Sequence, residues 1–96
     1  MRKTNEQSIG DVIRQWLKQS NMEEKITEVR INAFWGKVMG SDIQKLTERL
    51  VYRKKILTVY LRSAPLREEL SMAKTKIVQM INKEAGAHVV DEVIFR

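Results

Sequence analysis

Residues 47–62 read TERLVYRKKILTVYLR, two runs rich in β-branched and aromatic residues with three consecutive cations between them. Residues of these classes are typical of strands, so the segment predicts a β-hairpin. We place Lys54 and Lys55 in the turn. Tyr52 then faces Leu57 across the two strands. A shift of one residue would exchange the two faces of a strand, so the alternation itself favours this register.

The register gives the hairpin two different faces. The apolar face, expected in the core, carries Leu50, Tyr52, Leu57, Val59 and Leu61. The opposite face carries Arg49, Val51, Arg53, Thr58, Tyr60 and Arg62. Two-residue turns favour Gly or Asn because these residues adopt positive φ easily, so a longer loop is the alternative to a tight Lys-Lys turn.

Two helices are predicted before the hairpin. The first begins at Ser8, a good N-cap, and its apolar stripe of Ile9, Val12, Ile13, Trp16 and Leu17 stops near Ser20-Asn21. The second runs from Met22 to Met39 and ends before Gly40. It has two apolar stripes, one of Met22, Ile26, Val29 and Ala33 and one of Ile31, Phe34, Trp35, Val38 and Met39. We expect the first helix to pack against one stripe and the rest of the domain against the other. A further helical turn is expected at residues 41–46.

After the hairpin, Ser63 and Pro65 open a third helix that continues to Lys83 and closes at Gly86. Residues 89–95 then predict a last strand. The fold class is therefore α+β, in the order α-α-β-β-α-β, with a three-stranded sheet and helices packed on one of its faces. The last strand pairs either parallel beside the second strand or antiparallel beside the first. We expect one domain over residues 8–96 after a disordered segment, 1–7.

Composition narrows the function classes. The 96 residues carry a net charge of +6 and no cysteine, which removes disulfides and thiolate chemistry. Residues 33–67 hold eight Lys/Arg against two Asp/Glu, so the positive charge is concentrated around the hairpin and favours polyanionic partners. We find no signal-peptide core and no membrane-spanning run, and we expect a cytoplasmic protein.

Catalytic and metal sites find little support in the sequence. His88 is the only histidine, and nothing in the sequence places a carboxylate and a hydroxyl around it. Gly36 and Gly40 flank Lys37, but the Gly-Lys-Ser/Thr ending of a phosphate loop is missing. We therefore expect no enzyme activity, no catalytic residues, no metal and no cofactor.

The basic hairpin is the candidate binding site. We assign nucleic-acid contacts to Arg49, Arg53, Lys54, Lys55, Tyr60 and Arg62. Cations neutralise phosphates, and an exposed aromatic ring offers a base a stacking surface. The alternative is a solvated surface whose charges only prevent aggregation. Trp16 and Trp35 lie on apolar helical stripes, where core packing is expected more often than a partner-binding anchor.

Several segments of the sequence, taken in order, resemble the bacterial DciA-like family. The resemblance rests on the segment from Trp35 to Gly40, reading WGKVMG, on Ile43 and Thr47, on ILTV at 56–59, and on Ser63, Glu69-Leu70, Ile81-Asn82 and Gly86. Trp35 matches the family's signature tryptophan. Lys55 stands where the family usually has a turn glycine, and Leu66 stands where many members have another tryptophan.

The resemblance implies a KH-like fold, contact with the replicative DNA helicase, and affinity for single-stranded or forked DNA. We therefore expect a non-enzymatic replication accessory protein that assists helicase loading, with Trp35 as a partner-binding or signature residue. The alternatives are an adaptor that binds protein but not nucleic acid, and an RNA-binding KH-like module. The oligomeric state stays open.

Overall fold

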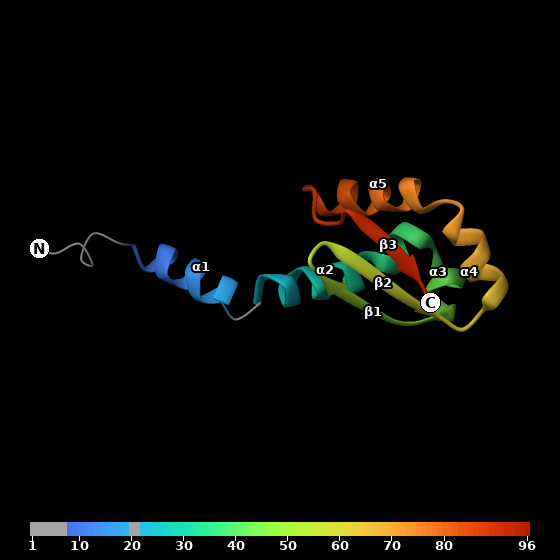
Figure 1. The fold of residues 1–96 in the computed structure, drawn as a ribbon, viewed down its shortest axis with the longest axis horizontal. Coiled ribbons are helices and arrows are strands. Elements are labelled where there is room, and N and C mark those ends of the chain that lie inside the picture. The colour runs from blue at the N-terminus through green and yellow to red at the C-terminus, as the bar shows by residue number, and fades with distance from the viewer. Residues whose placement is uncertain (1–7, 20–21) are drawn as a thin grey trace, which may run out of the picture.

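The computed structural model describes residues 8–19 and 22–96, which form five helices and three strands (Figure 1). The elements are α1 (Ile9–Gln19), α2 (Met22–Met39), α3 (Ser41–Leu46), β1 (Thr47–Arg53), β2 (Ile56–Leu61), α4 (Ala64–Ser71), α5 (Lys74–Ala85) and β3 (Glu92–Phe95). The fold is α+β, as predicted, and its arrangement is compatible with the KH-like expectation. The segment 1–7, predicted to be disordered, lies outside the described residues.

The sheet has the order β1-β2-β3, with β1 and β2 antiparallel. Tyr52 lies opposite Leu57 and Leu50 opposite Val59, so the predicted register is confirmed. A bulge at the start of β1 shifts the pairing between Thr47 and Arg49. Of the two placements left open for the last strand, the structure adopts the parallel one beside β2.

The apolar face of the sheet forms the core against the helices. All five hairpin residues assigned to it are buried, together with Val93 and Phe95 of β3. Trp35 and Ile31 of α2 and Ile77 and Ile81 of α5 complete the packing. On the other face the residues of the sheet are only partly buried or exposed, so the helices cover one face, as predicted.

The hairpin closes with a tight two-residue turn at Lys54 and Lys55. Both residues have positive φ, 50° and 63°, which is the left-handed region that Gly and Asn occupy more easily. The alternative of a longer loop is therefore wrong. The backbone N–H of Lys54 donates to the Glu24 carboxylate at 2.6 Å, which ties the turn to the beginning of α2.

The prediction that α1 packs against a stripe of α2 is wrong. The α1 residues Ile9, Val12, Ile13 and Trp16 are between 50% and 78% exposed. In α2, Met22, Ile26 and Val29 are between 37% and 65% exposed, and α1 projects away from the body of the molecule (Figure 1). The first stripe of α2 thus remains open in the described structure, although the periodicity of both helices is as predicted.

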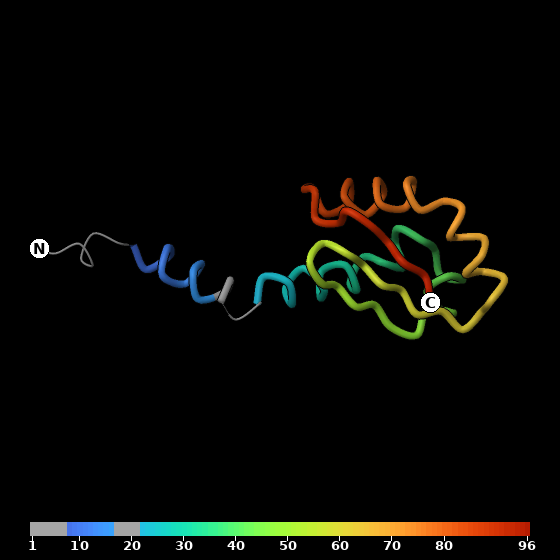
Figure 2. The backbone as a smooth tube through the Cα atoms, in the orientation of Figure 1, coloured from blue at the N-terminus to red at the C-terminus, as the bar shows by residue number. Residues whose placement is uncertain are grey.

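The prediction of one continuous third helix is wrong. The helix is broken into α4 and α5 at Met72 and Ala73 (Figure 2). An unbroken helix of this length would extend about 33 Å, whereas a six-residue strand spans about 20 Å. The break lets α4 turn at the end of the sheet and α5 run back along it. The predicted caps are confirmed: Ser63 accepts from the Leu66 N–H at 3.2 Å, and Gly86 has φ of 75°.

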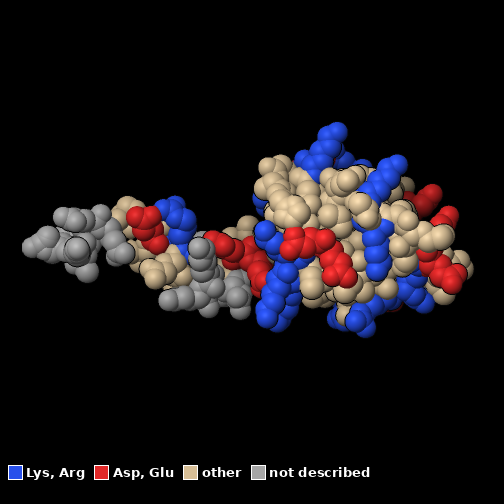
Figure 3. Space-filling model, turned by 45° about the horizontal axis from the view of Figure 1, so that its top comes forward, with Lys and Arg blue, Asp and Glu red and all other residues tan. Residues whose placement is uncertain are grey.

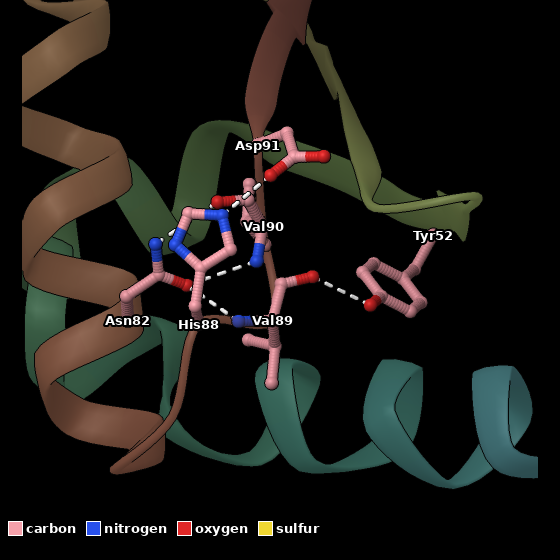
Figure 4. Close-up of polar contacts among 6 residues, drawn as sticks. All are labelled: Tyr52, Asn82, His88, Val89, Val90 and Asp91. Carbon is pink, nitrogen blue, oxygen red and sulfur yellow. Dashed lines mark hydrogen bonds and ion pairs between the residues drawn. The ribbon is translucent and has the colours of Figure 1, made fainter.

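The last strand starts at Glu92 rather than at Val89, because Asn82 of α5 binds the preceding backbone (Figure 4). Its Oδ1 accepts from the N–H groups of Val89 and Val90, and its Nδ2 donates to the Val90 carbonyl, each at 2.9 Å. These backbone groups therefore bind a side chain instead of a neighbouring strand. Tyr52 fixes the same segment by donating its hydroxyl to the Val89 carbonyl.

Relieving the positive φ at Lys55 should stabilise the protein. We expect Lys55→Gly to raise the free energy of unfolding by about 1 kcal/mol, because Gly adopts this backbone conformation without a Cβ clash. Urea denaturation measures the change. Lys55→Ala is the matched control, since it removes the same charge but keeps the clash; an equal gain in both variants would contradict the explanation from strain.

Tyr52 should make stability depend on alkaline pH. Burial, aided by the carboxylates of Glu24 and Asp91, raises the pKa of Tyr52 above its ordinary value. A pKa that is higher in the folded than in the unfolded protein means that folding favours the neutral phenol. The contribution of the Tyr52 phenol to the free energy of unfolding is therefore complete below about pH 10, and it is lost as pH rises through the pKa of the folded state. We expect Tyr52→Phe to cost about 1 kcal/mol at neutral pH, the net worth of one hydrogen bond.

The cost of Tyr52→Phe should then shrink above pH 10, as followed by urea denaturation of both proteins over a pH series. Tyr60→Phe serves as the control, because this variant removes a phenol from the opposite face of the sheet. A cost at Tyr52 that stays constant through pH 11 would contradict the assignment.

Candidate nucleic-acid interface

The face of the sheet opposite the core is the candidate binding surface, and we call it the open face. Its side chains lie in three rows across the strands, because the register fixes which residues are neighbours. The rows are Arg53–Ile56–Glu92, Val51–Thr58–Ile94 and Arg49–Tyr60–Arg96. The middle row is uncharged and partly buried. The open face therefore has an uncharged centre with arginines at both ends of the hairpin.

Arg49 and Tyr60 act as a unit at one end of this face. The Arg49 guanidinium lies 4.2 Å from the centroid of the Tyr60 ring, which is a cation–π contact. The contact holds the arginine side chain over the ring. One side of the Tyr60 ring is thereby occupied, so a base can stack on this pair through the other side of the ring or on the guanidinium.

Arg62 lies at the same end of the hairpin and has a carboxylate beside it. Its Nε is 3.9 Å from Oε2 of Glu48, and both side chains are more than half exposed. A long, solvated ion pair of this kind contributes little. Arg62 therefore retains most of its capacity to bind a phosphate, although Glu48 lowers the local positive potential.

The other predicted cations lie at the turn. Arg53 lies four residues after Arg49, about 13 Å away along β1. Lys54 and Lys55 line a shallow pocket of about 220 Å³ whose wall includes Glu23 and Glu24 of α2. Among the residues described, none of the three side chains at the turn forms an ion pair within 4.0 Å.

The structure thus sorts the six predicted residues into two groups. Arg49, Tyr60 and Arg62 lie together at one end of the hairpin, and Arg53, Lys54 and Lys55 lie at the other. The surface seen in Figure 3 carries acidic side chains among basic ones. The positive charge is therefore distributed in clusters rather than as one uniform patch.

Six residues of the open face were missing from the predicted site: Val51, Ile56, Thr58, Glu92, Ile94 and Arg96. Arg96 follows the last residue of β3, and its backbone carbonyl accepts from the Leu61 N–H at 2.8 Å. Alternation after the buried Phe95 places Arg96 on the open face next to Tyr60. The alternation can be read from the sequence. Assigning Arg96 to the site also requires knowing that β3 pairs with β2, which the sequence left open.

The two tryptophans have different environments. Trp35 is 2% exposed, and its Nε1 donates to the Thr47 hydroxyl at 3.0 Å, which in turn donates to the Ile43 carbonyl at 2.7 Å. This chain links α2, α3 and β1, so Trp35 lies in the core. Trp16 is 55% exposed, and the expectation that it packs in the core is wrong.

His88 lies outside the open face, in the loop before β3, and pairs with Asp91 (Figure 4). The structure therefore places a carboxylate beside it, which the sequence had not indicated. Both side chains are about 60% exposed, and an exposed pair contributes little to stability. Its geometry is that of a loop contact between residues three apart in the chain.

Within residues 8–19 and 22–96, no helix is long and apolar enough to cross a membrane. A family model described as "Dna[CI] antecedent, DciA" matches residues 8–95. No curated protein and no solved structure matches the chain.

Proposed function

Because the chain belongs to the DciA family, we propose that it is a non-enzymatic DNA-replication accessory protein that assists loading of the replicative helicase. The family suggests the role in helicase loading. The proposal adds two surfaces through which this chain would carry out that role. One binds DNA through the open face, and the other binds protein through exposed apolar side chains on α1 and α2.

The DNA half of the proposal depends above all on one observation, the outward position of the hairpin cations. Arg49, Arg53 and Arg62 alternate with the buried residues of β1 and β2, and Lys54 and Lys55 form the tip. Each phosphate that they neutralise releases a condensed counterion, which favours binding. The Arg49–Tyr60 unit adds a stacking surface for a base.

The uncharged centre of the open face favours single strands. Val51, Thr58 and Ile94 offer contacts to the faces of unpaired bases, while the cations at both ends contact the backbone. A duplex hides the faces of its bases in the stack, so it would use only the cations. We therefore propose single-stranded DNA, including the single-stranded arm of a fork, as the ligand of this surface.

The protein half of the proposal comes from the exposed stripes. A pocket of about 330 Å³ beside α2 is lined by Met22, Lys25, Ile26, Val29 and Arg30, and its surface is apolar. The stripe of α1 is also exposed. Large side chains exposed in rows mark a protein contact more often than isolated ones do. We propose that the helicase binds these two stripes.

Reversing the charge of the turn should remove DNA binding. We expect Arg53→Glu, Lys54→Glu and Lys55→Glu together to abolish salt-sensitive binding of single-stranded oligonucleotides in fluorescence anisotropy. In the unchanged protein, three phosphate contacts contribute about −2 to the slope of log K against log salt for single strands, so binding should weaken as salt rises.

The matched control for the turn reverses Lys45, Lys74 and Lys76 to Glu, which changes net charge equally but outside the hairpin. Unchanged affinity in a folded turn variant would rule out the hairpin as the DNA surface. An equal loss in both variants would mean that only net charge matters. Stronger competition by RNA than by DNA of the same sequence would favour the RNA-binding alternative.

Charges on the apolar stripes should remove helicase binding and leave DNA binding intact. We expect Ile13→Glu combined with Val29→Glu to lose co-purification with the replicative helicase, because each places a carboxylate in an apolar contact. Gln15→Glu adds a charge to α1 outside the stripe and should retain the helicase. Retention of the helicase by the double variant would contradict the assignment of this surface.

A further inference from the structure

The outer edge of β3 carries backbone groups that no other strand satisfies in the described part of the chain. Arg96 donates its N–H to the Val59 carbonyl at 2.9 Å and accepts from the Leu61 N–H, so its backbone faces β2. Residues that alternate with it, Val93 and Phe95, therefore direct their N–H and C=O groups away from β2. β3 is an edge strand of the sheet.

The opposite edge of the sheet is capped at its turn end by side chains of α2. The outward N–H of Tyr52 in β1 donates to Glu28 at 2.8 Å, and the N–H of Lys54 in the turn donates to Glu24 at 2.6 Å. These carboxylates occupy two of the donors that another strand would need, which is a common protection of edge strands. Among the described residues, no side chain is hydrogen-bonded in this way to the outward groups of β3.

The sequence of β3 is complementary to itself in one antiparallel register. Hydrogen-bonded pairs across an edge join residues that both face outward, so Val93 of one copy can pair with Phe95 of a second copy. This pairing forms two hydrogen bonds at each of two symmetric positions. It places Ile94 opposite its own copy on the two-fold axis and Glu92 opposite Arg96.

The charges select this register and this partner. Glu92 and Arg96 are exposed on the open face, and opposite charges directly across a strand pair stabilise it. Beside the edge, a groove of about 240 Å³ between α5 and the beginning of β3 leaves space for the approaching strand.

We propose that two copies of this chain associate through antiparallel pairing of their β3 edges, forming a six-stranded sheet with two-fold symmetry. The inference goes beyond the proposed function and does not depend on it. It has a consequence for the open face, because both copies turn this face to the same side. A continuous row then runs Arg53–Ile56–Glu92 in one copy and Arg96–Tyr60–Arg49 in the second.

Charge exchange tests the register. We expect the protein to show a concentration-dependent dimer in sedimentation velocity. Glu92→Arg and Arg96→Glu should each weaken it on the order of tenfold, because two like-charge pairs replace two opposite-charge pairs. Both residues are exposed, so the fold is retained.

An equimolar mixture of the two single variants should restore the dimer, since every cross-strand pair again joins a cation to a carboxylate. The double variant should restore it for the same reason. A dimer that both single variants leave unchanged would overturn the strand pairing and indicate the α1 and α2 stripes instead. A monomer at all concentrations would overturn the proposal as well.

A single cysteine gives an independent test of the two-fold axis. The chain has no cysteine, so Ile94→Cys introduces one thiol. Residues opposite each other in a non-hydrogen-bonded pair have Cα atoms about 4.5 Å apart, within the range that a disulfide spans. We expect Ile94→Cys to form a disulfide-linked dimer under mild oxidation and Thr58→Cys, one strand away, to remain monomeric on a non-reducing gel. Equal cross-linking of both would contradict the register.

Discussion

The two-residue turn at Lys54 and Lys55 is the constraint on which the rest of the structure depends. Successive side chains in a strand point to opposite faces, so the turn length, acting with the apolar alternation, decides which residues enter the core. With two residues in the turn, Leu50 and Val59 are buried while Arg49 and Tyr60 lie outside. One more residue would shift β2 against β1 and place cations among apolar side chains, where unpaired charges are very costly.

Two side-chain contacts then attach the helices to this hairpin. Trp35 binds the Thr47 hydroxyl and so fixes α2 against the start of β1. Asn82 binds the backbone of residues 89 and 90 and so fixes the end of α5 against the start of β3. In each contact a hydrogen bond lies within largely apolar packing. The hydrogen bond fixes the relative orientation of the two elements, which apolar packing alone would not do. The open face depends on the Asn82 contact in particular, because it helps to place β3, and with it Arg96, beside Tyr60.

The sequence pattern predicted the features that depend on residues close together in the chain. The helix at 22–39, the Ser63 cap, the Gly86 end and the hairpin register follow from spacing and from the chemistry of single residues. The break at Met72 and Ala73 was missed, because the apolar stripe continues through it and the helix bends for a tertiary reason, the length of the sheet. The exposure of Trp16 was missed for a related reason: periodicity shows that a helix has an apolar face but not what covers it. For the site, the hairpin residues were predicted, whereas Arg96 required the pairing of β3.

The turn also connects stability with the proposed DNA contact. A left-handed conformation costs an ordinary residue roughly 1–2 kcal/mol, and strained residues cluster at functional sites because the surrounding structure enforces them. Here the register and the Glu24 carboxylate enforce the conformation, since Glu24 binds the backbone N–H of Lys54. The acid thus holds the backbone of the tip, and the two lysine side chains remain without an ion pair among the described residues. Gly at position 55 would relieve the strain and would also remove a cation from the end of the hairpin, so stability and the proposed DNA contact favour different residues at this position.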